Sequence, residues 1–178
     1  MEQTLTIEGH ETLTSDEGAR AEVVGRLFDL HHARLYRLAL RMTWGDDDAR
    51  DLVQECFVRA IGRELPVRAE DAERWLVRVL INLCRDRNRR SRVRIAHARA
   101  ECAAPTQRAE ADPAVNAAVR EAVRRLPVRQ RAVVILHEIE GQSLRDIAAT
   151  LGIAAVTARW HLHVALKRLR KELSCENS

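Results

Sequence analysis

The sequence is poor in aromatic residues, glycine and proline, and it has no long apolar run. Aromatic residues make up 3% of its 178 residues, and there are 7 glycines and 4 prolines. No apolar stretch approaches the roughly 20 residues of a membrane-spanning helix, so we expect no membrane insertion. Hydrophobic residues, mostly aliphatic, reach 46%, which excludes a disordered chain. Abundant alanine, leucine, arginine and glutamate favour helices, and we expect an all-α protein.

The four cysteines (Cys56, Cys84, Cys102 and Cys175) form no Cys-x-x-Cys pair and have no histidines at zinc-ligand spacing. Cys56 and Cys84 lie in apolar helical patterns, where we expect small core residues. A disulfide framework is not expected with so much aliphatic sequence. The chain also lacks a His-Glu-x-x-His motif, a glycine-rich phosphate loop and a recognisable catalytic set. We therefore expect neither an enzyme nor a cofactor.

Charge is distributed unevenly along the chain. Lysine and arginine number 30 against 26 acidic residues, a net charge of +4 with a pI near 9.2. Residues 1–18 are acidic and polar; we expect a disordered tail rather than a signal peptide, and a cytoplasmic protein. Arginines crowd residues 74–99 against the single acid Asp86, and a second basic cluster occupies 167–171. Two basic zones indicate two contacts with a polyanion, the alternative being two solvated helix faces.

Apolar residues at three- and four-residue spacing predict three helices in the first part of the chain, at 19–43, 48–63 and 72–90. Gly45 and the aspartates after it end the first helix and begin the second. Together the three helices predict a small bundle over residues 19–90.

The periodic pattern disappears over residues 91–112, which we interpret as a flexible linker. A second unit covers residues 113–174. Its periodicity predicts four helices, at 113–126, 128–140, 143–151 and 155–172. The sequence thus predicts two small helical domains joined by a linker, without internal repeats.

The last two predicted helices have the pattern of a helix-turn-helix, with a turn that begins at Gly152. At about 100° per residue, one face of the final helix is apolar and consists of Ala158, Leu162, Ala165 and Leu169. The opposite face carries Trp160, His163, Val164, Lys167 and Lys171, flanked by Arg159 and Arg170. Such a face suits a helix that enters the DNA major groove. The alternative is a helical hairpin with a solvated basic face.

The third predicted helix carries a stripe of nucleic-acid-binding side chains. Arg78, Asn82, Arg85 and Arg89 follow one another at spacings of four, three and four residues. Guanidinium groups bind phosphates, and an amide reads base edges. Trp75, one turn earlier, either stacks on an unpaired base or anchors the core.

The second predicted helix has a different outer side, formed by Asp51, Gln54, Glu55 and Val58. Acidic, amide and apolar groups together suit a protein partner rather than DNA.

Motifs in these positions resemble the extracytoplasmic-function (ECF, group IV) branch of the sigma-70 factors. Residues 48–57 (DARDLVQECF) are similar to the DAEDLVQExF motif of that family. Further similar blocks follow in the family's order: Trp75-Leu76, Ile81-Asn82, Asp86-Arg87, Leu126 to Arg131, Glu140-Gly141, Ile147-Ala148 and Leu151-Gly152-Ile153. The resemblance covers residues 20–174.

The resemblance implies a protein that binds core RNA polymerase and directs it to promoters. Residues implied to contact the beta-prime clamp helices are Asp48, Asp51, Leu52, Gln54, Glu55, Phe57 and Val58. The resemblance implies that the loop at 64–71 and the helix after it melt and capture the single-stranded −10 element. The helix residues implied in this contact are Trp75, Arg78, Asn82, Arg85, Asn88 and Arg89. Residues implied to read the double-stranded −35 element are Thr157, Arg159, Trp160, His161, His163, Lys167 and Arg168. The second domain would also contact the beta flap.

The resemblance further implies control by an anti-sigma factor held between the two domains, and a monomer when free of partners. The chain departs from the family pattern at Arg50, where an acid is usual, and at His161, Val164 and Leu166, which are often basic. Fewer cations imply weaker phosphate anchoring. The alternative function is a free-standing helix-turn-helix regulator, which would dimerise on operator DNA.

Overall fold

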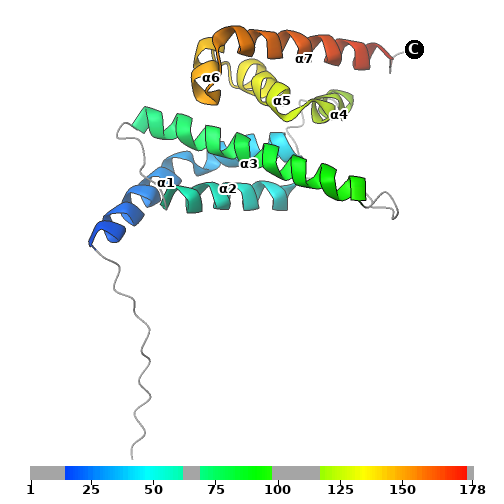
Figure 1. Cartoon of the computed structure of the whole chain (residues 1–178). Coiled ribbons are helices and arrows are strands. Elements are labelled where there is room, and N and C mark those ends of the chain that lie inside the picture. Colours follow the sequence, from blue (N-terminus) through cyan, green and yellow to red (C-terminus); the bar gives the residue numbers. More distant parts are fainter. Residues whose placement is uncertain (1–14, 62–68, 98–116, 176–178) are drawn as a thin grey trace, which may run out of the picture.

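The computed structural model describes residues 15–61, 69–97 and 117–175, and within these ranges every regular element is helical. The first unit contains α1 (Ser15–Thr43), α2 (Asp46–Ile61) and α3 (Ala69–His97). The second contains α4 (Ala117–Arg125), α5 (Val128–Val134), the π-helical turn η1 (Ile135–Ile139), α6 (Leu144–Leu151) and α7 (Ala155–Cys175). The predicted all-α fold is confirmed. In Figure 1 the second unit lies above the first, with α3 packed against α5 and α6.

Several helix boundaries differ from the predicted ones. Helix α1 begins at Ser15, inside the predicted acidic tail, and α3 continues to His97, inside the predicted linker. Residues 91–97 contain no glycine or proline to break a helix, and two arginines and an alanine favour one, so the loss of apolar periodicity after residue 90 does not end α3. The predicted tail over 1–14, the loop over 62–68 and the linker over 98–112 lie outside the described residues.

The turn between α1 and α2 is made differently from the prediction. Trp44, rather than Gly45, takes the left-handed conformation with φ 63°, and its N–H donates to the Leu40 carbonyl at 2.8 Å. A bulky residue pays about 1 kcal/mol for this conformation. The Trp44 ring packs against the core, which holds the residue in place.

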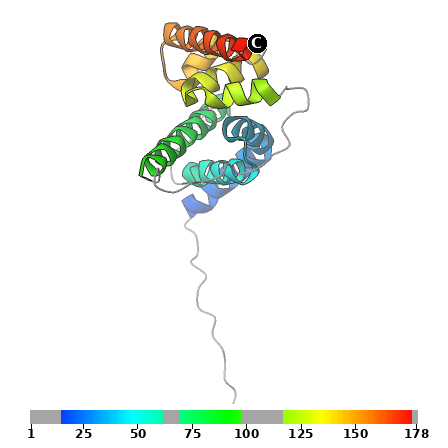
Figure 2. The ribbon, with the colours of Figure 1, turned by 90° about the vertical axis from the view of Figure 1, so that its right-hand side faces the viewer.

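The two units share one continuous hydrophobic core. Figure 2 shows the helices of the second unit stacked on those of the first. Leu38 and Leu80 of the first unit and Leu136 and Ile147 of the second are almost completely buried. Burying apolar side chains of this size contributes about 1.5–3 kcal/mol each. Apolar contact therefore holds the second unit against α3.

The predicted helix at 128–140 is two elements. Over η1 the backbone widens into a π-helical turn, and the Glu140 N–H donates to the Ile135 carbonyl at 3.1 Å. Gly141, with φ 68°, then ends the helix at the predicted place. This turn brings the Glu140 carboxylate toward α1.

Cys56 and Cys84 are buried core residues, as predicted. Burial raises the pKa of each thiol to about 12, so both are protonated and unreactive at neutral pH.

Candidate nucleic-acid interface

The helix-turn-helix predicted from the sequence is present, and its local chemistry explains its shape. The Ser143 hydroxyl accepts a hydrogen bond from the Asp146 N–H at 3.2 Å and so caps α6. Gly152 ends α6 in the left-handed conformation with φ 65°, and the Ile153 N–H closes the turn on the Ala148 carbonyl at 3.0 Å. These bonds fix the angle at which α7 leaves α6.

Gly152 and Gly25 give a pair of stability predictions with opposite signs. Gly152→Ala is expected to lower the free energy of unfolding by about 1 kcal/mol, because alanine resists the left-handed conformation. A Cβ there would also lie 3.4 Å from the Arg78 Cζ. Gly25→Ala in α1 is expected to raise the free energy of unfolding by about 0.5–1 kcal/mol, since a Cβ there meets no atom within 4 Å. Urea unfolding of the two variants measures both signs.

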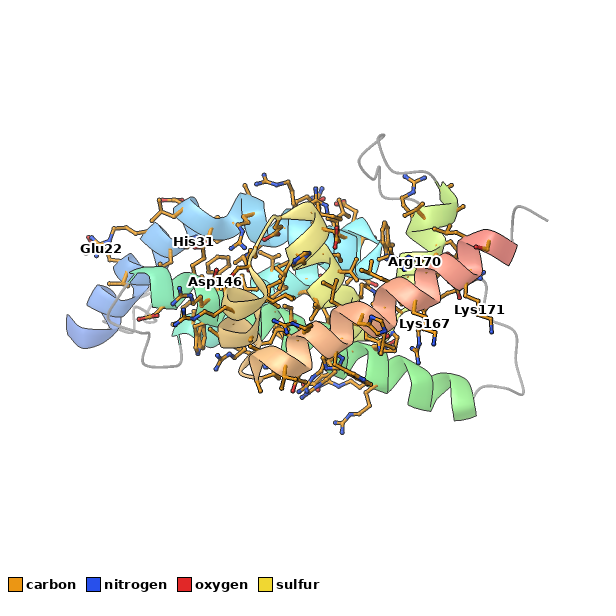
Figure 3. The ribbon with its side chains drawn as sticks, turned by 90° about the horizontal axis from the view of Figure 1, so that it is seen from above. Glu22, His31, Asp146, Lys167, Arg170 and Lys171 are labelled. Atoms are coloured by element: carbon orange, nitrogen blue, oxygen red, sulfur yellow. The ribbon has the colours of Figure 1, made fainter. Side chains whose placement is uncertain are left out.

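Helix α7 has the two faces that the sequence predicts. Ala158, Leu162, Ala165 and Leu169 are buried against α5 and α6. The outer face is exposed and runs from Val156 through Trp160 and His163 to the basic C-terminal half of the helix. Figure 3 shows Lys167, Arg170 and Lys171 along that half. The exposed face therefore has apolar groups at its N-terminal end and cations farther along.

Two of the predicted −35 residues are partly engaged within the protein. The His161 imidazole is half-buried, and burial, followed by the charge of Arg129, lowers its pKa. It is therefore neutral at neutral pH and adds no positive charge to the face. Arg168 donates from Nη1 to the side chain of buried Gln130 at 3.2 Å, which ties α7 to α5.

Arg78, a predicted −10 residue, is occupied by the second unit in this arrangement. Its Nε donates to the Thr150 carbonyl at 2.6 Å and its Nη2 to the Ala149 carbonyl at 2.5 Å. These carbonyls lie in the last turn of α6, where the helix dipole attracts a cation; the Ala149 carbonyl also accepts the Gly152 N–H at 3.4 Å. Arg78 thus caps α6, which commits its Nε and Nη2 donors to the second unit, although the residue as a whole is exposed.

The rest of the predicted −10 stripe lies on α3. Arg85, Asn88 and Arg89 are exposed, and Asn82 is half-buried. Trp75 is half-buried and packs against the core. Its position supports the anchoring role that the sequence left open.

The outer side of α2 presents the predicted protein-facing set. Asp51, Gln54, Glu55 and Val58 are exposed, with Val58 59% accessible. Leu52 and Phe57 belong to the core, at 2% and 6% exposure, so their side chains mainly hold α2 in place. The period of a helix explains the difference, because these two positions point toward α1 and α3.

Arg87 organises this surface, although the sequence pattern indicated it only as part of the Asp86-Arg87 block and predicted no contact for it. Its Nη2 pairs with Asp48 and lies 3.7 Å from the Asp51 carboxylate, so it bridges α2 and α3. Arg50, the departure from the family pattern, pairs with Asp46 at 3.0 Å within α2. The groove beside Arg87 measures about 720 Å³ and is also lined by Leu52, Glu55, Leu83, Asp86, Arg89 and Arg90.

Further arginines that the sequence analysis missed join the two units. Arg34 of α1 binds Glu73 of α3 and Glu140 after η1, each at 2.6 Å. Arg131 of α5 donates to the Met42 carbonyl at the end of α1. These partners lie 39 to 106 residues away along the chain, so no local pattern reveals them.

Two kinds of site were not found in the part of the chain that the structure describes. No group of three or more His, Cys, Asp and Glu side chains there is placed to hold a metal ion. Nor does any helix of that part have the length and apolar character needed to cross a membrane.

The chain matches known families in both units. The Sigma-70 region 2 family matches residues 27–94, and the Sigma-70, region 4 family matches residues 116–169. The ECF RNA polymerase sigma factor SigM of Mycobacterium tuberculosis is 35% identical over 156 residues, which covers 86% of this chain and 78% of that protein. SigL of the same species is 33% identical over 162 residues, covering 87% and 91%. SigE of Mycolicibacterium smegmatis is 35% identical, and this chain spans 60% of its length.

Solved structures have the same fold. The sigma factor RpoE of Bartonella quintana, in complex with the anti-sigma factor NepR, superposes with a TM-score of 0.65 at 22% identity, covering 86% of this chain and 98% of that one. CnrH in complex with the cytosolic domain of CnrY gives a TM-score of 0.58 at 22% identity, covering 89% and 92%.

Proposed function

This chain belongs to the ECF family of RNA polymerase sigma factors, and from that premise we propose that it binds core RNA polymerase and directs transcription from specific promoters. The observation that carries the proposal is the two-faced helix α7, buried on its apolar side and exposed on its basic side within a helix-turn-helix. Such a protein acts by binding rather than by catalysis, and it works in the cytoplasm with the polymerase.

The α2 surface is the proposed contact with the beta-prime clamp helices of the polymerase. The exposed side chains of Asp51, Gln54, Glu55 and Val58 support it, since they combine acidic, amide and apolar groups on one face. Arg87 holds Asp48 and limits the freedom of that carboxylate, which lowers the entropy cost of docking. We retain Leu52 and Phe57 as residues that shape the surface from beneath.

The α3 stripe is the proposed contact with the −10 element. Arg85, Asn88 and Arg89 are exposed, as a strand-binding surface requires. Arg78 joins them once it leaves the end of α6. Full use of Arg78 in promoter capture would therefore separate the two units at this contact.

The exposed face of α7 is the proposed contact with the −35 element in the major groove. Arg159, Trp160 and His163 lie in its N-terminal half, where helix-turn-helix proteins contact bases, and Lys167 lies farther along, where they contact phosphates. The beta flap is the proposed polymerase contact of this unit. We propose residues 19–90 and 113–174 as the two functional regions, as the sequence predicts.

An anti-sigma factor is the proposed regulator, by analogy with the sigma factor RpoE, which was solved in complex with the anti-sigma factor NepR. We propose that the free protein is a monomer.

Run-off transcription tests the proposal. Purified core polymerase is combined with this protein on a pool of genomic fragments, and new transcripts are mapped. Specific transcripts that depend on the protein are expected. DNA binding by the protein alone, as a dimer and without any complex with polymerase, would favour the free-standing regulator.

Val58 gives a direct test of the polymerase surface. Val58→Ala is expected to weaken binding to core polymerase about fivefold, since an interface that covers this side chain loses about 1 kcal/mol of apolar burial. Leu30→Ala, on the exposed side of α1, is the matched control and should leave the affinity unchanged. Equal affinities for the wild type and Val58→Ala would mean that the polymerase does not contact this part of α2. Fluorescence anisotropy with labelled protein measures the three affinities.

A further inference from the structure

Two large apolar side chains stand unburied on the exposed face of α7. Val156 is 73% exposed and Trp160 is 56% exposed. They are four residues apart, so they lie one above the other on the same face at the N-terminal end of the helix. They are not part of the core, because Ala158, Leu162 and Ala165 form the buried face of α7.

The surroundings of this pair, which we name the Val156–Trp160 pair, favour a polyanion over an apolar protein groove. Arg159 is exposed beside it, and His163 and Lys167 continue the same face. Arg170 and Lys171 add positive charge at the far end of the helix (Figure 3). A helix with cations along its length and apolar groups at its tip matches a duplex, whose phosphates flank the groove and whose base edges lie at its floor.

The apolar feature that base pairs present in the major groove is the C5-methyl group of thymine. Valine offers only methyl groups, and the indole offers a large apolar ring surface beside its single N–H donor, so the surface that the two side chains share is apolar. We propose that Val156 and Trp160 read thymine methyl groups at neighbouring base pairs of the −35 element. This inference rests on the proposed sigma-factor function and names the base chemistry that its −35 contact selects.

The test uses DNA that differs by single methyl groups. Holoenzyme assembled from this protein and bacterial core polymerase selects −35 sequences from a randomised duplex pool, and the selected element is then synthesised with uracil in place of each thymine. Thymine is expected to be enriched at neighbouring positions. Removing one contacted methyl is expected to weaken binding about fourfold, the loss for one buried methyl-sized group.

Variants assign the effect to the pair. Trp160→Ala is expected to bind thymine and uracil DNA equally at one position, and Val156→Ala at its neighbour. Both positions are exposed in a helix, so alanine preserves the fold, which circular dichroism checks. Lys167→Ala is the matched control: it weakens binding to both DNAs alike, because a phosphate contact carries no sequence information.

Several outcomes would overturn the inference. One is equal binding of thymine and uracil DNA by the wild type. Another is a methyl effect that persists in both alanine variants. Unchanged DNA binding by both variants would also overturn it and would make the pair a protein-docking site. If the holoenzyme binds and selects promoters without any methyl dependence, the proposed function stands and this inference fails. If no holoenzyme forms, both the proposed function and this inference are wrong.

Discussion

Replacing Arg131 by alanine is expected to lower the free energy of unfolding by about 3 kcal/mol. The Arg131 guanidinium donates to the carbonyls of Met42, Arg124 and Leu126, the last at 3.1 Å. Burial lowers the pKa of this guanidinium from its ordinary value, a sign of how little water surrounds it. Alanine would leave these carbonyls at the junction of α1, α4 and α5 without their donor. Urea unfolding followed by circular dichroism measures the loss.

Arg129→Ala is the matched control for this prediction. Arg129 is an exposed residue of the same helix, so its replacement is expected to change the free energy of unfolding by less than about 0.5 kcal/mol. If both variants were equally stable, water would be satisfying the three carbonyls, and Arg131 would not be what joins the ends of these helices.

Replacing Arg34 by alanine is expected to open the contact between the two units. Arg34 holds Glu73 and Glu140 at 2.6 Å each, and the Glu140 side chain is 13% exposed, so this bridge is poorly screened by water. Hydrogen bonds between charged groups of this kind contribute about 2 kcal/mol after allowance for the exposed Glu73. Losing them in Arg34→Ala is expected to shift the equilibrium between joined and separated units about thirtyfold toward separation. Hydrogen exchange of the α6 amides should accelerate by up to the same factor.

The opening should also be visible in DNA binding. Once the units separate, Arg78 is released from the Ala149 and Thr150 carbonyls, and affinity for single-stranded promoter DNA is expected to rise. Arg26→Ala is the matched control, because Arg26 pairs at 3.0 Å with Glu22 on the same helix. Unchanged exchange in Arg34→Ala would mean that apolar packing alone holds the units together.

Local patterns predicted the helices and much of the candidate surface. The inner face of α7, the outer side of α2 and the turn at Gly152 follow from spacing within single helices. Where prediction failed, a non-local contact or a propensity was decisive. Helix α3 continues past residue 90 without apolar periodicity, and Trp44 takes a conformation that core packing enforces.

By itself, the sequence determined the all-helical class, the family and the two-faced character of α7, because helix period, capping residues and motif order are local properties of the chain. Only the tertiary structure decided that Arg78 caps α6, that Arg34 and Arg131 join the two units and that His161 has a lowered pKa. These features depend on carbonyls and carboxylates brought together from distant parts of the chain. The role of a charged side chain depends on its interaction partner and on its burial from water, and the residues next to it in the sequence determine neither.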